Sequence, residues 1–167
     1  MTERAIFGRR YSSFQPANTE VYLLNGAGVS LTTPTTQSFI AGASLIQGEA
    51  VYVSGVFALP ASSASGVAPT NYNVIGLTAT AAAFSGTVPV VFDDIAVVSD
   101  ANITADTTLI PGEYYFLSRY AGQITRYSTA SGLITAASGS AALVAVGQAL
   151  STTELQVEIE APIVLTD

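Results

Sequence analysis

One stretch of ten residues occurs twice in this chain, and this duplication limits the folds that the sequence can adopt. Residues 45–54 return as residues 109–118, displaced by 64 positions. Two further pairs of matched blocks follow, 74–79 with 144–149 and 86–92 with 154–159. Two copies of a unit this long indicate a duplicated β-rich module, because solenoids are built from three or more short repeats. The matched residues are mostly apolar, Gly or β-branched, so they encode shape rather than a chemical site.

Two segments of the duplicated unit are predicted as strands. Residues 49–53 and 114–117 are rich in β-branched and aromatic side chains. Gly48 and Gly112 precede these segments, where a turn or a bulge needs a residue without a Cβ atom. If Gly112 has a positive φ, a β-branched residue there is expected to be severely destabilising.

The remaining segments complete an all-β prediction. Residues 154–160 alternate between polar and apolar side chains, as in a strand with one solvated face. Residues 30–44 are rich in Thr, Ser and Gly and indicate a loop or an edge strand. Short helical turns are expected at 80–84 and 140–143. We therefore expect a compact body like a β-sandwich or barrel, built from two repeated β units, with an extended N-terminal arm.

This prediction divides the chain into three parts. Residues 1–44 form the N-terminal arm and edge strand, residues 45–108 the first β repeat unit and residues 109–167 the second. We expect the two units to form one compact body over residues 45–167.

The composition excludes several kinds of chemistry. Charged residues make up 10% of the chain, whereas an ordinary domain has about 25%. The chain has no Cys, His, Lys or Trp. It therefore offers no thiol nucleophile, no Ser-His-Asp triad, no Schiff-base lysine and no P-loop. We expect a protein that is not an enzyme and holds no cofactor.

The charge is distributed unevenly. Net charge is −7 overall, with +2 in residues 1–10 and −9 in the remainder. An acidic chain argues against nucleic acid as a partner. The basic start is either a solvated tail or an arm that docks on an acidic patch of another subunit. The candidate partner-binding residues of this arm are Arg4, Phe7, Arg9, Arg10 and Tyr11.

The chain carries no signal for a membrane. Arg9 and Arg10 interrupt the first apolar stretch before it reaches the length of a signal peptide. No apolar window is long enough to span a bilayer. We expect a protein made in the cytoplasm, without a membrane partner.

Two groups of acidic residues are candidates for chemistry. Asp93 and Asp94 could offer hard oxygen ligands to a divalent cation, although two Asp before a strand are also common in turns. Glu49 and Glu113 could form a carboxylate pair for glycoside hydrolysis, or be two copies of one structural residue. We favour the structural interpretation for both groups.

Tyrosines and arginines alternate in the second repeat. Such residues can bind sugars or single-stranded nucleic acid, and they also anchor protein interfaces. We favour a position in the core or in an interface over a ligand site. The candidate oligomer-interface residues are Tyr114, Arg119, Tyr120, Arg126 and Tyr127.

The repeated unit resembles the head decoration, or capsid cement, proteins of tailed bacteriophages. The resemblance is carried by residues 112–117, 122–124, 144–150 and 153–163, with a weaker copy over residues 48–92. It implies a non-enzymatic virion protein, a homotrimer that binds the major capsid protein on the outer surface of the capsid and stabilises the shell. Similar β modules occur in tail-fibre, spike and baseplate proteins, so receptor or glycan contact is the alternative function.

Overall fold

The computed structural model describes residues 35–64, 67–104, 106–126 and 142–165. All of these residues belong to one compact unit, Pro34–Asp167. The unit is all-β, as predicted, and its described helical segments are two short 3-10 helices, η1 (Pro69–Tyr72) and η2 (Asp100–Asn102). In the described part of the chain, no helix has the length and hydropathy needed to cross a bilayer.

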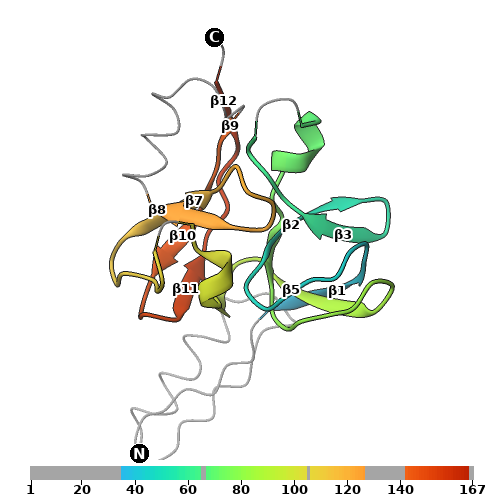
Figure 1. Ribbon diagram of the computed structural model, residues 1–167, viewed down its shortest axis with the longest axis horizontal. Coiled ribbons are helices and arrows are strands. Elements are labelled where there is room, and N and C mark those ends of the chain that lie inside the picture. The colour runs from blue at the N-terminus through green and yellow to red at the C-terminus, as the bar shows by residue number, and fades with distance from the viewer. Residues whose placement is uncertain (1–34, 65–66, 105, 127–141, 166–167) are drawn as a thin grey trace, which may run out of the picture. The chain divides into compact units, whose positions relative to one another are not determined.

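The first repeat is a closed five-stranded barrel (Figure 1). Its strands, in spatial order β1-β3-β2-β4-β5, are β1 (Thr36–Ala41), β2 (Ala50–Ser54), β3 (Phe57–Pro60), β4 (Gly76–Thr78) and β5 (Thr87–Val91). β1 closes the barrel, since it pairs in parallel with β3 and antiparallel with β5. The prediction of a loop or edge strand at residues 30–44 is therefore wrong for β1. Its exposed polar side chains suit a barrel strand whose outer face is solvated.

The second repeat is a five-stranded sheet. Its strand order matches that of the barrel when the barrel is read in the direction β1-β5-β4-β2-β3. The strands, in order β6-β11-β10-β7-β8, are β6 (Ile95–Val97), β11 (Glu154–Val157), β10 (Ala145–Ala149), β7 (Tyr114–Leu117) and β8 (Ile124–Arg126). A single parallel bridge, Ile103 to Ile124, joins the chain after η2 to β8. β9 (Ala142–Leu143) and β12 (Ile163–Val164) form a separate two-stranded ribbon.

The pairing registers are also the same in the two repeats. Val51 pairs with Gly76 in the first repeat, and Tyr115 pairs with Gly147 in the second. Val51 and Tyr115 keep the displacement of 64 positions seen in the sequence. A β-bulge between Ala145 and Gly147 adds one residue to the second copy. The duplicated sequence thus corresponds to a duplicated five-stranded unit.

The repeating unit begins earlier than the sequence indicates. Its first strand is β1 in one copy and β6 in the other, before the expected starts at residues 45 and 109. These two strands occupy equivalent places because Gln37 pairs with Val90 of β5, and Ala96 pairs with Leu155 of β11. β1 begins with three polar residues, whereas β6 is apolar throughout, so sequence comparison does not detect this part of the duplication.

The helical turns expected at residues 80–84 and 140–143 are not formed in the described residues. Ala82 instead makes an antiparallel β-bridge to Leu45. Ala142 and Leu143 belong to β9, and residues 140–141 lie outside the described residues. Short Ala-rich segments have little helical stability of their own, so tertiary pairing determines their conformation.

The hydrophobic residues form two clusters, and both repeats contribute to the larger one. A small cluster fills the interior of the first barrel and consists of Ala41, Leu45, Val51, Ala58, Val88 and Val90. A larger cluster contains the buried residues of the second repeat together with Ala50, Leu77 and Val91 of the first. Successive residues of a strand point to opposite faces, so Val51 faces the barrel interior and Ala50 faces the second repeat.

Candidate interaction surface

The turn before β2 packs closely against the second repeat. Gly48 has a φ of +78°, and a Cβ atom there would lie 2.5 Å from the Cα of Val98 and 2.6 Å from the carbonyl oxygen of Val97. The N–H of Ala50 donates to the carbonyl oxygen of Gly122 at 2.8 Å. Backbone therefore meets backbone, and the contact leaves no room for a side chain at residue 48.

Further hydrogen bonds extend this contact to η2 and along the hairpin between β7 and β8. The amide nitrogen of the Asn102 side chain donates to the carbonyl oxygen of Gln47 at 2.7 Å. The hydroxyl of Ser62 donates to the carbonyl oxygen of Arg119, and the N–H of Gly122 to that of Ala61, each at 2.7 Å. These bonds satisfy backbone groups that the apolar contact removes from water.

Glu49 and Glu113 occupy matching positions but different environments. Glu49 is 9% exposed and lies against Gly122, and its carboxylate accepts the N–H of Ile46 at 2.9 Å. Burial raises the pKa of Glu49, and the hydrogen bond from Ile46 opposes that shift. Glu113 is exposed on the turn before β7. The two glutamates therefore occupy equivalent turns of the two repeats, one buried and the other exposed.

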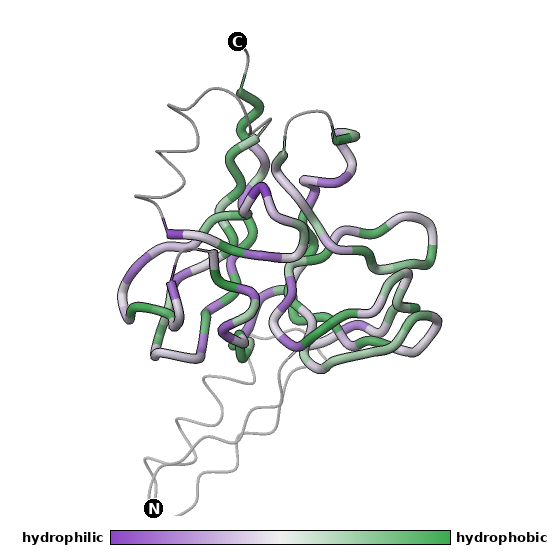
Figure 2. Tube along the Cα trace, viewed as in Figure 1, coloured by the Kyte–Doolittle hydropathy of each residue, from purple (hydrophilic) through white to green (hydrophobic). Residues whose placement is uncertain are grey.

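The outer end of the first barrel exposes several large apolar side chains. Val56 is 60% exposed, Phe84 67%, Phe57 42% and Ile40 40%. Figure 2 shows hydrophobic residues in the connections of this barrel as well as along its strands. These residues are not among the predicted site residues, because isolated apolar side chains carry no sequence pattern that distinguishes surface from core.

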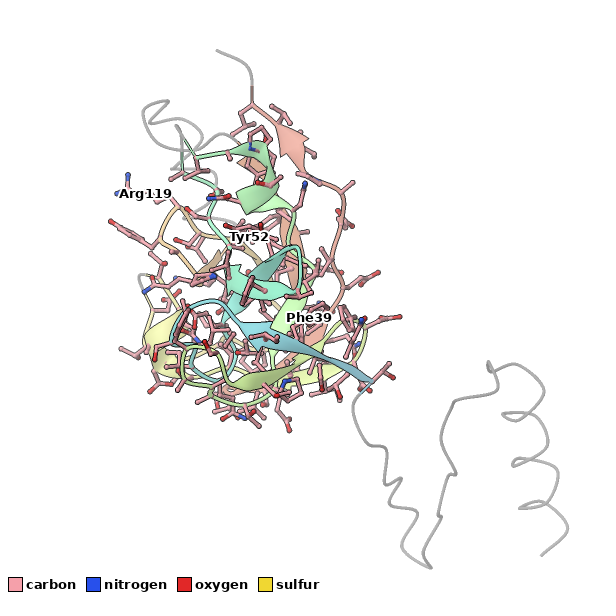
Figure 3. The ribbon with its side chains drawn as sticks, turned by 90° about the vertical axis from the view of Figure 1, so that its right-hand side faces the viewer. Phe39, Tyr52 and Arg119 are labelled. Carbon is pink, nitrogen blue, oxygen red and sulfur yellow. The ribbon has the colours of Figure 1, made fainter. Side chains whose placement is uncertain are left out.

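Two open grooves lie among these side chains. One has a volume of about 410 Å³ and is lined by residues of β1, the β2–β3 turn and the start of β5, namely Gln37, Ser38, Phe39, Ile40, Gly55, Val56 and Thr87. The other, of about 190 Å³, lies between Phe57 and Phe84. Phe39 packs edge-on against Phe92, with ring centroids 6.3 Å apart, on the barrel face seen in Figure 3.

The structure separates the residues expected to form an oligomer interface. Tyr114 begins β7 and is 51% exposed, whereas Tyr120 lies beyond the other end of β7 and is 50% exposed. Arg119 donates to the hydroxyl of Tyr120 at 3.1 Å, and its guanidinium carbon lies 5.1 Å from the ring centroid. Figure 3 shows Arg119 projecting outward from the body. Tyr114 and the Arg119–Tyr120 pair are therefore separate surface features.

Two other residues of this region have partners within the chain. Arg126 forms a bidentate ion pair with Asp106, at 2.6 and 3.0 Å, and this carboxylate raises the pKa of Arg126. Tyr115 is fully buried, and its hydroxyl accepts the N–H of Ile110 at 3.0 Å. Burial raises the pKa of Tyr115. Among the predicted interface residues, Tyr127 lies outside the described residues, as does the predicted arm with Arg4, Phe7, Arg9, Arg10 and Tyr11.

The Asp93–Asp94 pair takes part in a turn. One carboxylate oxygen of Asp94 accepts the N–H of Ile95 at 2.7 Å, and the other accepts the N–H of Thr35 at 3.0 Å. Among the residues that the structure describes, no group of three or more His, Cys, Asp or Glu could hold a metal ion. The geometry favours the turn interpretation of this pair.

The chain was compared with protein families and with curated proteins. No family model matches it, and no curated protein is significantly similar to it.

Proposed function

We propose that this protein is a non-enzymatic structural protein of a tailed-bacteriophage virion that binds the outside of the major capsid shell and stabilises it. The bacteriophage assignment rests on the sequence resemblance to capsid decoration proteins. The observation that carries the adhesive role is the number of exposed large apolar side chains on a body with few charges. Contiguous exposed apolar surface is typical of sites that bind other proteins.

The chemistry of the body also suits adhesion. The groove between Phe57 and Phe84 is lined by apolar and small residues, and it contains no titratable side chain. The two glutamates considered for catalysis differ in burial, which is unlike a pair arranged to share one substrate. Binding energy in such a body comes from apolar contact and from backbone hydrogen bonds.

The location on the virion can be tested by immunogold electron microscopy of intact particles, with an antibody raised against this chain. Gold distributed over the head is the expected result. Antibody first absorbed with the purified protein serves as the control and should remove the label. Particles that carry no specific label would overturn the virion assignment.

The basic arm makes a second part of this proposal testable. Deletion of residues 1–20 should weaken attachment to capsids while the body keeps its melting temperature. A matched variant with Arg4, Arg9 and Arg10 replaced by Ala separates the contribution of charge from that of chain length. Unchanged attachment of both variants would contradict a role for the arm.

A second candidate function is a tail-fibre, spike or baseplate module that contacts a receptor or glycan. The exposed Arg119–Tyr120 pair favours it, because an aromatic face beside a guanidinium suits sugar binding. Label confined to the tail, together with glycan-array binding that is lost in Tyr120→Ala, would replace the capsid proposal with this one.

A further inference from the structure

The contact between the two repeats joins two different surfaces. We call residues 47–50 of the first repeat its turn surface. We call residues 97–99, 102 and 119–122 of the second repeat its hairpin surface. The turn surface of the first repeat lies on the hairpin surface of the second, through the close packing at Gly48 and the hydrogen bond from Ala50 to Gly122.

Because the repeats have the same registers, each repeat carries both surfaces. The turn surface of the second repeat is residues 111–114, at the displacement of 64 positions. The hairpin surface of the first repeat is residues 38–40 and 55–56, since Ser38 is equivalent to Val97 and the β2–β3 turn is equivalent to the β7–β8 turn. Among the residues that the structure describes, neither of these two surfaces has a counterpart.

The two turn surfaces share the Gly-Glu pair and differ in whether it is covered. Gly48, Glu49 and Ala50 are buried, whereas Gly112, Glu113 and Tyr114 are all exposed. Gly112 keeps the backbone conformation of Gly48, with a φ of +87°, but a Cβ atom there would meet nothing within 4 Å. The second repeat therefore has the geometry for this contact without the partner.

The hairpin surfaces show the same contrast. Gly122 has a φ of +76° and lies against the side chain of Glu49. Gly55, at the equivalent turn, has a φ of +63° and has nothing within 4 Å of a Cβ position. The open groove of about 410 Å³ lies between residues 37–40 and this turn.

Both uncovered surfaces expose large apolar side chains. Ile110, Tyr114 and Leu150 are 38%, 51% and 48% exposed around the second turn surface. Ile40 and Val56 are 40% and 60% exposed on the first hairpin surface. Removing these side chains from water favours association.

We propose that copies of this chain associate head to tail, with residues 111–114 of one copy seated on residues 38–40 and 55–56 of the next. This contact continues the one between the repeats. The N–H of Tyr114 takes the role of the N–H of Ala50 and donates to a carbonyl oxygen at the β2–β3 turn of the next copy. Two different surfaces meet, so the association is heterologous and adds copies in one direction, closing into a ring where the rotation allows it.

The inference goes beyond the proposed function, which names no contact between copies of this chain. It concerns the purified protein alone. Failure of self-association in solution would overturn it and leave capsid binding to the labelling experiment.

The test compares the mass of the full chain and its variants by sedimentation and native mass spectrometry. Wild type should form oligomers at about 100 μM, a concentration that saturates a micromolar Kd. Val56→Asp on the hairpin surface and Tyr114→Asp on the turn surface should each weaken association at least about tenfold. Ile163→Asp is the matched control, because Ile163 is 61% exposed on β12 and belongs to neither surface.

Mixing the two variants distinguishes head-to-tail association from a symmetric dimer. Each variant keeps one intact surface, and the intact surfaces are complementary. The mixture of Val56→Asp and Tyr114→Asp should therefore form one-to-one heterodimers and nothing larger. Circular dichroism confirms the fold, and Val56→Ser and Tyr114→Ser replace any variant that does not fold.

Three results would overturn the proposal. The first is a monomeric wild type at about 100 μM, which would mean that another occupant covers these surfaces. The second is an oligomer that neither substitution weakens. The third is a mixture of the two variants that stays monomeric.

Discussion

The two repeats have the same strand order and register, yet the first closes into a barrel along a paired strand and the second closes through one bridge. Side-chain size accounts for this difference. At four equivalent buried positions the first repeat has Ala41, Val51, Ala58 and Val90, and the second has Ile103, Tyr115, Ile124 and Leu155. Larger side chains take more room in a close-packed interior, and the second repeat has one bridge where β1 and β3 have two paired positions.

The repeats also differ in what covers them. Substitution of the two turn glycines should give the largest difference in the free energy of unfolding. Gly48→Ala should lower the free energy of unfolding by about 3–5 kcal/mol, since it combines left-handed strain with overlap at Val98. Gly112→Ala should lower it by about 1–2 kcal/mol, from strain alone. Urea unfolding of dilute protein measures both. Equal losses would show that the contact at Gly48 contributes little.

The positive φ that the sequence suggested for Gly112 is confirmed, at +87°. Open space around this position means that strain is the main effect of a substitution within one copy. Its severity with a β-branched residue remains a prediction.

A second difference concerns the buried tyrosine of the second repeat. Tyr115→Phe should lower the free energy of unfolding by about 1 kcal/mol, because it removes the acceptor of the Ile110 N–H. Val51, the equivalent residue of the first barrel, has no polar group. Tyr114→Phe, on the exposed side of the same strand, is the control and should leave the stability of dilute protein unchanged. A larger loss in the control would contradict this assignment.

A third difference depends on pH. The pKa of Glu49 is higher in the folded chain than its ordinary value of 4.5, so the folded state holds the proton more tightly than the unfolded state. Relative to Glu49→Gln, wild type should therefore gain stability as the pH falls from 7 toward 4.5 and lose it as the pH rises through the raised pKa. Melting temperatures across this range measure the effect.

Glu113→Gln is the matched control for this pH dependence, because Glu113 is exposed on the equivalent turn. Its melting profile should follow that of wild type in dilute solution. Parallel profiles for wild type and Glu49→Gln would show that burial of Glu49 has no energetic consequence.

The smallest effect concerns how each sheet closes. The N–H of Gly42 donates to the carbonyl oxygen of Ala58. The equivalent N–H of Thr104 donates to the carbonyl oxygen of Ile124, and both distances are 2.8 Å. After correction for intrinsic rates, hydrogen exchange at the Thr104 amide should be about tenfold faster than at the Gly42 amide. The reason is that one bridge opens more easily than a paired strand. Exchange measured by NMR that is slower at Thr104 would contradict the comparison of the two closures.

Much of this architecture was predictable because it depends on local pattern. β-branched and aromatic residues indicated β7 at residues 114–117, and alternation placed Leu155 and Val157 on a buried face. The duplication and its displacement of 64 positions were visible because packing inside equivalent strands restricts residue type. β1 was predicted as a loop or an edge strand, because nothing in its own pattern reports the second partner that closes the barrel.

The candidate surfaces were much less predictable. Arg126 and Asp106 are 20 positions apart, and no pattern indicated their ion pair. Val56 and Phe84 resemble core residues in the sequence, yet they are among the most exposed apolar side chains of the described residues. Exposure depends on which segments cover a residue, and the covering segments are far away along the chain.

The sequence by itself determined an all-β chain with a duplicated unit, because strand propensity and repeat spacing are properties of neighbouring residues. Only the tertiary structure decided that the same Gly-Glu turn is buried at Gly48 and open at Gly112. The physical reason is that the two repeats of one chain form a single turn-to-hairpin contact with each other. One turn surface and one hairpin surface remain uncovered by the residues that the structure describes, and no local pattern identifies which.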